Sequence, residues 1–256
     1  MEFHSIEDVV NALDAIVQHC ESTKNRAGYF AALYKRMTMA VRDGIAKGMF
    51  EDGPRMEQLD ITFAKRYLDA WESYQKPATC SASWQCAFDN CSNKNLTVIQ
   101  QLILGINTHI NLDLAIAAAA AAPGNSIHAL ANDFNRINDV IASLVNNIQQ
   151  CLEAVWAPMR LLDRIANRPE QSVLNFSIGI ARKTAWTNAT ILAQMNPQQQ
   201  QEQIKLMDTM VNAIGHKVIH PGLGMEALLK VIRLTEYEDV ARTIRLIDIT
   251  GVDVMK

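Results

Sequence analysis

The sequence predicts an all-α protein, built as one irregular multi-helix bundle over residues 1–256. In most long segments the apolar residues recur every three or four positions, which is the period of a helix. No series of alternating strands occurs along the chain. Hydrophobic residues make up 49% of the 256 residues and charged residues 20%, which is enough apolar material for one large core.

The N-terminal half contains four expected helices. Ser5 is suited to begin the first, because its hydroxyl can accept a backbone N–H and Asp8 follows three residues later. Gly53-Pro54 interrupts the pattern before the third helix. Pro77 to Asn95 is rich in Ser, Cys and Asn and is expected to be a loop or an irregular segment. The expected helices run from Ser5 through Val17, from Ala27 to Ala46, from Met56 to Tyr74 and from Thr97 to Ala122, where Pro123-Gly124 ends the last one.

The C-terminal half is also expected to be helical. Pro197, followed by four glutamines, is typical of a helix start with a solvated first turn. In the last segment Val240, Ile244 and Ile247 have helical spacing, and a short strand is the alternative there. The expected helices run from Ser126 to about Trp156, from Gln171 to Met195, from Gln198 to Val218, from Met225 to Leu234 and from Tyr237 to Ile249.

Charge and composition argue against several classes of protein. The net charge of −3 leaves no excess of Lys and Arg to displace counterions from phosphates, so no nucleic-acid partner is expected. Residues Met1 to Asp8 lack the basic start and apolar core of a signal peptide. The chain has five cysteines, an odd number, and no CxxC pair, which is typical of free thiols in a cytoplasmic protein.

The most apolar segment, Leu96 to Ala122, is expected to be a buried helix rather than a transmembrane segment. It contains Asn107, His109, Asn111 and Asp113. Burying these polar side chains in a bilayer would cost several kcal/mol.

His109 and Asp113 form the most informative pair in the sequence. On a helix they lie one turn apart on the same face, which Ile106 and Ala117 extend with apolar groups. The pair is therefore expected to point into the core. Burial of both groups is costly unless they are paired, hydrogen-bonded or metal-bound. Two interpretations stay open: half of a metal site, or a buried His–Asp pair that orders the core.

The next expected helix contributes further polar groups. It contains Asp133, Asn138 and Asp139, and the short connection at 123–125 favours antiparallel packing against the central helix. Asp133 lies one turn from Ile137 and could face the core. Its carboxylate is then a candidate third metal ligand, although a solvated face is the alternative for the asparagines.

Two other pairs are weaker candidates. Arg182 and Trp186 share a helix face and could cover a pocket, or they could simply pack with the charged group at the surface. His216 and His220 have a spacing that can bind zinc, but the glutamate of an HExxH motif is missing. Imidazoles near a helix C-terminus also complement the helix dipole, which is the favoured interpretation.

A set of short motifs stands in a characteristic order along residues 5 to 195. The most specific is Leu104-Gly-Ile-Asn-Thr-His-Ile-Asn-Leu-Asp-Leu114. The others are Gly28-Tyr-Phe30 with Tyr34 and Thr38, Phe50-Glu-Asp-Gly-Pro-Arg55, Phe63-Ala-x-x-Tyr67, Asp133-Phe-x-x-Ile-Asn138 and Ala181-Arg-x-x-Ala-Trp186. This set is similar to a largely bacterial family whose function is unknown. The resemblance implies that the polar helix pair belongs to the family pattern, and it implies no particular activity.

Two more distant resemblances suggest a chemistry. His109 and Asp113 are similar to the His-x-x-x-Asp element of the zinc-dependent phospholipase C and nuclease superfamily, but alanines stand where that superfamily has its next histidine. Asp139, Ser143 and Asn147 have the spacing of the second metal motif of class I terpene synthases. Asparagine replaces the expected glutamate there, and the first, aspartate-rich motif is missing.

Three functional hypotheses follow, of which the first is the favoured interpretation and the other two are alternatives. In the first, the chain is a hydrolase-like, metal-dependent enzyme that acts on a small-molecule or lipid-like ligand. In the second, it is a non-enzymatic ligand-binding or interaction protein with a structural His–Asp network. In the third, it is a terpene-synthase-like enzyme with an apolar substrate. The first hypothesis assigns a divalent ion (zinc, manganese, iron or magnesium) to His109, Asp113 and Asp133, and catalytic roles to Asp139, Asn138 and Arg182.

Overall fold

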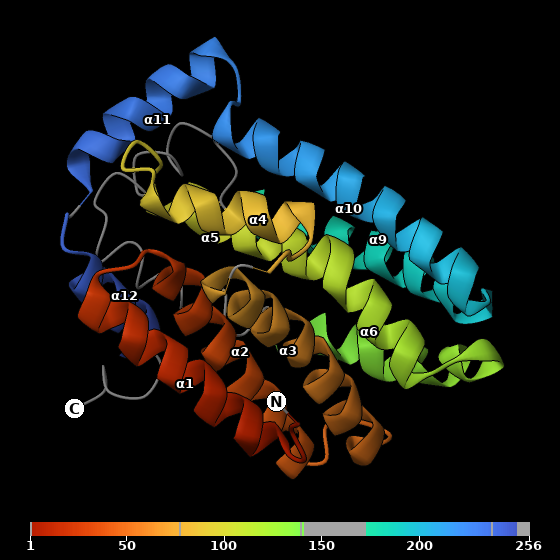
Figure 1. Ribbon diagram of the computed structural model, residues 1–256. Helices are drawn as coiled ribbons and strands as arrows, with labels where there is room; N and C mark the ends of the chain where they lie inside the picture. The colour runs from red at the N-terminus through yellow and green to blue at the C-terminus, as the bar shows by residue number, and fades with distance from the viewer. Residues whose placement is uncertain (1, 77, 139, 141–172, 237, 250–256) are drawn as a thin grey trace.

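The computed structural model describes residues 2–76, 78–138, 140, 173–236 and 238–249. Every regular element within these ranges is helical, and no strand occurs among them (Figure 1). The predicted all-α fold class is therefore confirmed.

The helices follow the predicted segments closely in most places. Residues 131–138 are also helical. The α-helices are α1 (Ile6–Thr23), α2 (Ala27–Ala46), α3 (Gly53–Gln75), α4 (Ala82–Asp89), α5 (Val98–Thr108), α6 (Leu114–Ala121), α9 (Val173–Gln194), α10 (Pro197–Ile219), α11 (Leu223–Thr235) and α12 (Val240–Ile249). The shorter elements are two 3₁₀ helices, η1 (Asn90–Ser92) and η3 (Gly124–Leu130), and one turn of π-helix, η2 (His109–Asp113).

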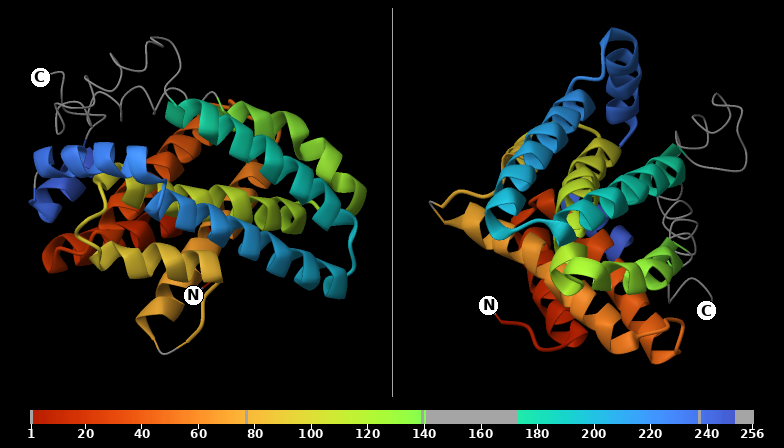
Figure 2. Two further views of the ribbon diagram at one scale, coloured as in Figure 1. Left: turned by 90° about the horizontal axis from the view of Figure 1, so that it is seen from above. Right: turned by 90° about the vertical axis from the view of Figure 1, so that its right-hand side faces the viewer.

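The helices divide into groups that surround the central α5–η2–α6 rod. Helices α1, α2 and α3 pack together on one side, and α12 lies against α1 and α2. Helix α10 covers α4 and α5, while α9 packs on α6 and on the π turn (Figures 1 and 2). The central rod therefore packs against α2, α3, α4, α9 and α10.

Local sequence signals begin several helices as expected. The Ser5 hydroxyl accepts the backbone N–H of Asp8, and the Asp8 carboxylate accepts that of Ser5, which completes a capping box. Asn196 and Gln199 form the same reciprocal pair at the start of α10. These bonds satisfy N–H groups that would otherwise have no partner in the first turn.

Two predicted segments differ from the structure in detail: the segment 77–95 and the start of the helix expected from Ser126. Residues 77–95 were expected to be irregular, yet they contain α4 and η1. Helix α4 forms because Trp84 and Phe88 are buried against the core and because Asp208 of α10 accepts the backbone N–H groups of Ala82 and Ser83, at 2.7 and 2.9 Å. Such distant partners leave no trace in the local spacing of the residues.

The helix expected from Ser126 begins differently. Residues 124–130 form the 3₁₀ helix η3, and α-helical geometry starts only after it. The rest of that expected helix, to Trp156, lies largely outside the described residues. At the C-terminal end, α12 shows that the segment around Ile244 is a helix and not the alternative strand.

The apolar segment Val98–Ala121 is long and apolar enough to cross a membrane. Within the bundle, however, 72% of its most apolar stretch is buried. The alanines of α6 explain this burial, because Ala115, Ala117 and Ala118 are fully buried and Ala185 and Ala189 of α9 are fully buried in the same cluster. The segment is packed as a core helix, as its polar side chains predict.

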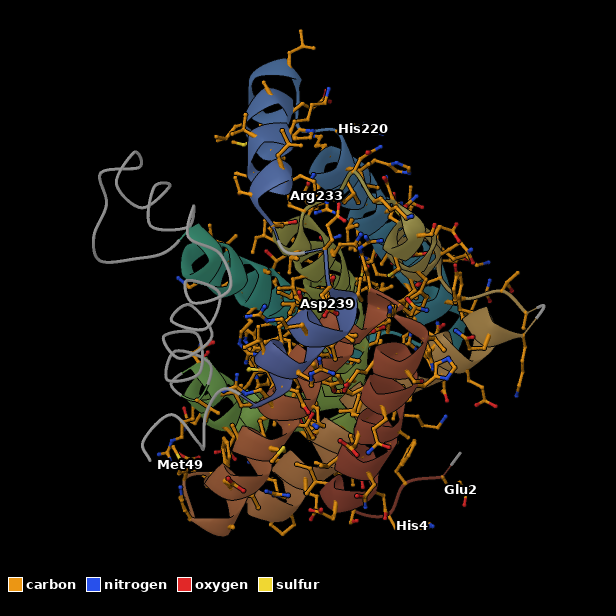
Figure 3. All side chains as sticks on the ribbon, turned by 90° about the vertical axis from the view of Figure 1, so that its left-hand side faces the viewer. Glu2, His4, Met49, His220, Arg233 and Asp239 are labelled. Atoms are coloured by element: carbon orange, nitrogen blue, oxygen red, sulfur yellow. The ribbon has the colours of Figure 1, made fainter. Side chains whose placement is uncertain are left out.

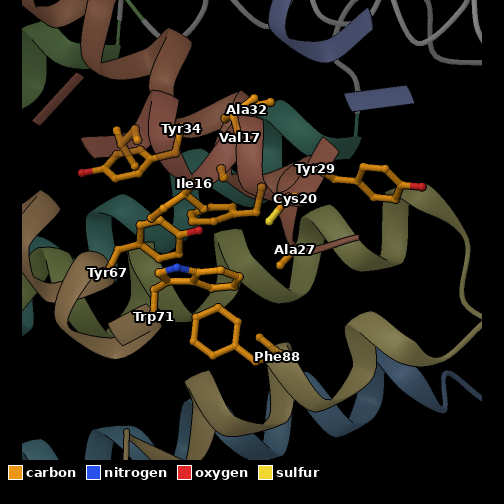
Figure 4. Close-up of a cluster of buried hydrophobic side chains, with 14 of the residues drawn as sticks. Ile16, Val17, Cys20, Ala27, Tyr29, Ala32, Tyr34, Tyr67, Trp71 and Phe88 are labelled. Atoms are coloured by element: carbon orange, nitrogen blue, oxygen red, sulfur yellow. The ribbon is translucent and has the colours of Figure 1, made fainter. Parts of the chain in front are cut away.

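The buried side chains form two clusters, and the partly buried Phe63 packs against both. The larger one contains the aromatic rings of α2, α3 and α4, and Figure 4 shows Tyr34, Tyr67, Trp71 and Phe88 within it. Helix α12 closes this cluster at Gly28, where an added Cβ would lie 2.5 Å from Cδ1 of Ile244. The same added Cβ would lie 2.7 Å from Cβ of Cys20, so the glycine is required for the close approach of α1 and α2.

Candidate functional site around the π turn

The strongest candidate site lies where the central rod changes from α-helix to π-helix. The backbone N–H of Leu114 donates to the carbonyl of His109, five residues earlier, so the turn between them is wider than an α-helical turn. The predicted pair, His109 and Asp113, occupies the two ends of this turn. Single π turns inside α-helices are frequent at functional sites.

The carboxylate of Asp113 is buried and accepts three side-chain donors. Trp84 Nε1 donates to Oδ2 at 2.8 Å, and Arg66 Nε donates to Oδ1 at 3.2 Å. His109 Nδ1 lies 3.1 Å from Oδ2. These donors come from α4, α3 and the π turn itself, so a single carboxylate joins three elements of the fold.

The imidazole of His109 is held in one tautomer by this arrangement. An ionised carboxylate accepts hydrogen bonds only, so Nδ1 must carry the proton and Nε2 of the neutral ring has a free lone pair. Among the described residues Nε2 has no hydrogen-bond partner, although it is buried. Burial lowers the pKa of His109 despite the neighbouring Asp113, which favours the neutral ring.

A second buried acid, Asp60, shares the neighbour Tyr34 with Asp113. Burial raises the pKa of Asp60 in α3 to about 7, and Glu57 adds to the shift. Within the described chain Asp60 Oδ2 has no hydrogen-bond partner. Burial, followed by the charges of Asp60 and Asp113, holds the pKa of Tyr34 well above its ordinary value. Tyr34 in turn meets the His109 ring edge to face at a centroid distance of 4.3 Å.

Asp133 is buried but has other partners than the predicted ones. Its carboxylate accepts the backbone N–H groups of Glu51 and Asp52, at 2.7 and 3.0 Å. Arg55 Nη2 also donates to it at 3.2 Å. Asp133 therefore holds the loop before α3 and the first turn of that helix.

The predicted catalytic residues form a separate contact. Arg182 Nε donates to Asn138 Oδ1 at 2.6 Å, and Arg182 Nη2 donates to the carbonyl of Phe134 at 2.6 Å. The guanidinium carbon lies 4.6 Å from the centroid of the Phe134 ring. Burial lowers the pKa of Arg182 to about 10. Asp139, the third residue of this predicted set, lies outside the described residues.

The structure thus separates the three predicted metal ligands into two networks. His109 bonds to Asp113, whereas Asp133 bonds to the 51–55 segment. Within the described ranges no three His, Cys, Asp or Glu side chains gather closely enough to hold one ion. His216 and His220 are exposed at the C-terminal end of α10, where Figure 3 labels His220.

Sequence reasoning missed two donors that define the site, Arg66 and Trp84. They stand 47 and 29 positions before Asp113, and neither has a spacing that marks it. The aromatic neighbours Tyr34 and Phe63 did carry a signal, because both belong to motifs of the family resemblance. Only the folded chain shows that these rings surround His109.

Comparison with known proteins places the chain in a family. The pattern of a family of unknown function (DUF5995) matches residues 6–221. The chain belongs to this family. The DUF5995 match contains the π turn, both networks described above and all of α10, whereas α11 and α12 follow it. No curated protein and no solved structure matches the chain, so the likeness to zinc-dependent phospholipases and terpene synthases gains no support.

Proposed function

We propose that this DUF5995 protein is a non-enzymatic interaction protein in which the His109–Asp113 network holds the helices in place. One observation carries the proposal: the polar groups of the π turn face inward, while large apolar side chains face solvent on α10. Leu206, Met210 and Ile214 are 62%, 68% and 45% exposed. Exposed apolar residues that form a row, rather than standing singly, are typical of an interaction surface.

The hydrogen bonds of Asp113 support a structural role. Three donors to one buried carboxylate offset the cost of removing its charge from water. Because the donors come from different helices, the network also fixes how α3, α4 and the central rod pack. A buried polar network whose groups are all bonded stabilises one arrangement of the helices over alternative packings.

The same geometry limits how an ion would bind. Nδ1 of His109 is engaged by Asp113, so a metal would bind at Nε2 and Asp113 would position the imidazole. The described residues supply no second and third protein ligand there. The donor set therefore does not fit the predicted site of His109, Asp113 and Asp133 around one ion.

One observation favours an enzyme as a second candidate. His109 Nε2 carries a free lone pair, and Asp113 orients the ring in the way that a carboxylate orients a catalytic histidine. In that case His109 would act as a general base toward a small-molecule or lipid-like substrate that reaches the π turn. The two candidates differ in whether small molecules can reach Nε2.

Chemical modification of histidines separates the two candidates. Diethyl pyrocarbonate acylates accessible neutral imidazoles, and mass spectrometry can follow each of the six histidines. His109 is 2% exposed, whereas the other five are exposed and serve as internal controls. The proposal expects His109 to react only after the protein unfolds. Reaction of His109 in the native protein at the rate of His19 or His216 would support the enzyme and exclude a closed structural network.

The proposal places the protein in the cytoplasm. Four of the five cysteines, Cys20, Cys80, Cys86 and Cys91, are free, and Cys151 lies outside the described residues. Free thiols in both core and loops are typical of a reducing compartment.

A further inference from the structure

The outer face of α10 carries an apolar row bounded by opposite charges. Leu206, Met210 and Ile214 follow one another at intervals of four residues, so they lie along one side of the helix. The adjacent side, with Met207, Val211 and Gly215, lies about 100° around the helix and is buried against the bundle. The row is nevertheless open to solvent beside this buried side, because all three of its side chains are exposed, and Figure 1 shows α10 at the edge of the bundle.

Small side chains lie beside this row. Thr209 and Ala213 are exposed between its apolar residues, so a second helix could approach the backbone of α10 closely. An apolar row of this length with small neighbours fits the side of another helix better than it fits a flat surface.

The row is complementary to itself when two copies run antiparallel. A twofold axis at Met210 brings Met210 of each copy together and sets Leu206 of one copy level with Ile214 of the other. Each residue advances about 1.5 Å along the helix. With the same axis, Glu202 of one copy stands within about 1.5 Å of the level of Lys217 of the other.

The charges at the two ends of the row match this arrangement. Glu202 and Lys217 are both exposed. Among the described residues neither takes part in an ion pair, and Glu202 accepts a hydrogen bond from Gln198 Nε2 at 3.5 Å. In an antiparallel pair each Glu202 meets a Lys217, so two opposite-charge contacts flank the apolar centre. A parallel pair would instead place like charges side by side.

We propose that α10 is the interface of a homodimer, in which two copies pair antiparallel about Met210. This inference rests on the proposed function and names the partner as a second copy of the chain. One helix from each copy is a small interface. The dimer is therefore expected to be reversible and to depend on protein concentration.

A charge exchange tests the pairing directly. Sedimentation equilibrium over a concentration series would measure the dimer dissociation constant. Glu202→Lys and Lys217→Glu, each alone, are expected to weaken the dimer about tenfold, because each puts like charges at both ends. The double variant E202K/K217E restores opposite charges and should return the constant to near the wild-type value. Met210→Asp, which puts two carboxylates at the axis, should leave only monomer.

Leu234→Asp is the matched control. Leu234 is 86% exposed on α11, outside the row, so this variant should dimerise like the wild type. Circular dichroism would confirm that each variant keeps its helix content. A wild-type protein that is monomeric throughout the series, a double variant that stays as weak as the single ones, or a Leu234→Asp protein that dissociates like Met210→Asp would each overturn the dimer. Those results leave His109 modification unaffected, so the dimer and the proposed function can fail separately.

Discussion

The imidazole of His109 lies face to face with the phenyl ring of Phe63, with ring centroids 3.7 Å apart and planes 8° from parallel. Stacked rings leave only the edge of the imidazole for polar contacts, and Asp113 occupies its Nδ1 side. A protonated ring would be a buried charge between apolar groups, in agreement with the lowered pKa of His109. The fold thus stabilises a neutral histidine in one orientation.

The metal hypothesis has a direct measurement. Elemental analysis of untagged protein, purified without chelator and supplemented with zinc, manganese, iron or magnesium, is expected to find no stoichiometric ion. His109→Ala and Asp113→Ala should then change the free energy of unfolding without changing the metal content. About one ion per chain, lost in both variants, would instead restore the metal-dependent enzyme.

Removing one donor from Asp113 should be costly. Trp84→Phe keeps a large ring but deletes the Nε1–H that donates to the carboxylate, so we expect a loss of about 1–3 kcal/mol in urea unfolding. The control is Trp71→Phe, which changes a tryptophan of the same apolar cluster that lies beside Phe88. Equal losses in the two variants would show that ring volume, and not the hydrogen bond, determines the effect.

Asp60 should make stability depend on pH. Its folded pKa of about 7 lies above the unfolded value of about 3.9, so the folded state binds the proton more tightly. The resulting stabilisation is complete below about pH 4 and is lost as the pH rises through about 7. Asp60→Asn should therefore gain stability over the wild type at pH 8, by roughly 2–4 kcal/mol, and much less at pH 5. Asp69→Asn, an exposed change on the same helix, should show no such difference, and an equal gain at both pH values for Asp60→Asn would contradict the assignment.

Asp133 should control the loop before α3. In Asp133→Ala, the amide hydrogens of Glu51 and Asp52 lose their acceptor and are expected to exchange with solvent faster. Asp208→Ala is the paired experiment, because its carboxylate holds the amides of Ala82 and Ser83 in the same way. Each variant should speed exchange at its own site only. Faster exchange at the π turn in Asp133→Ala would mean that the two networks are coupled.

The sequence predicts what depends on local spacing. Helical periodicity places His109 and Asp113 on one buried face, and the structure joins them by a hydrogen bond. Ser5 and Asp8 likewise predict the start of α1 correctly. In both cases the interacting groups are three or four residues apart, so the helix alone brings them together.

The rest depends on contacts between distant segments. Asp133 is a buried carboxylate, as expected of a metal ligand. Its partners, however, are the backbone N–H groups of residues 51 and 52, which the fold brings to it from a distant part of the chain. Helix α4 depends on Asp208, more than 120 positions later. The π turn contains one more residue than an α-helical turn. This insertion shifts the spacing of the apolar side chains by only one position, so the sequence pattern does not reveal it.

The close packing around Gly28 bears on what residue other members of the family can carry at this position. The helix seated on it, α12, begins after residue 221, where the family match ends. Ile244 of α12 meets this position with the end of a flexible side chain, whereas Cβ of Cys20 in α1 would stand 2.7 Å from a new Cβ. A relative with a larger residue at this position therefore holds α1 and α2 farther apart than they lie here, whether or not it has a counterpart of α12.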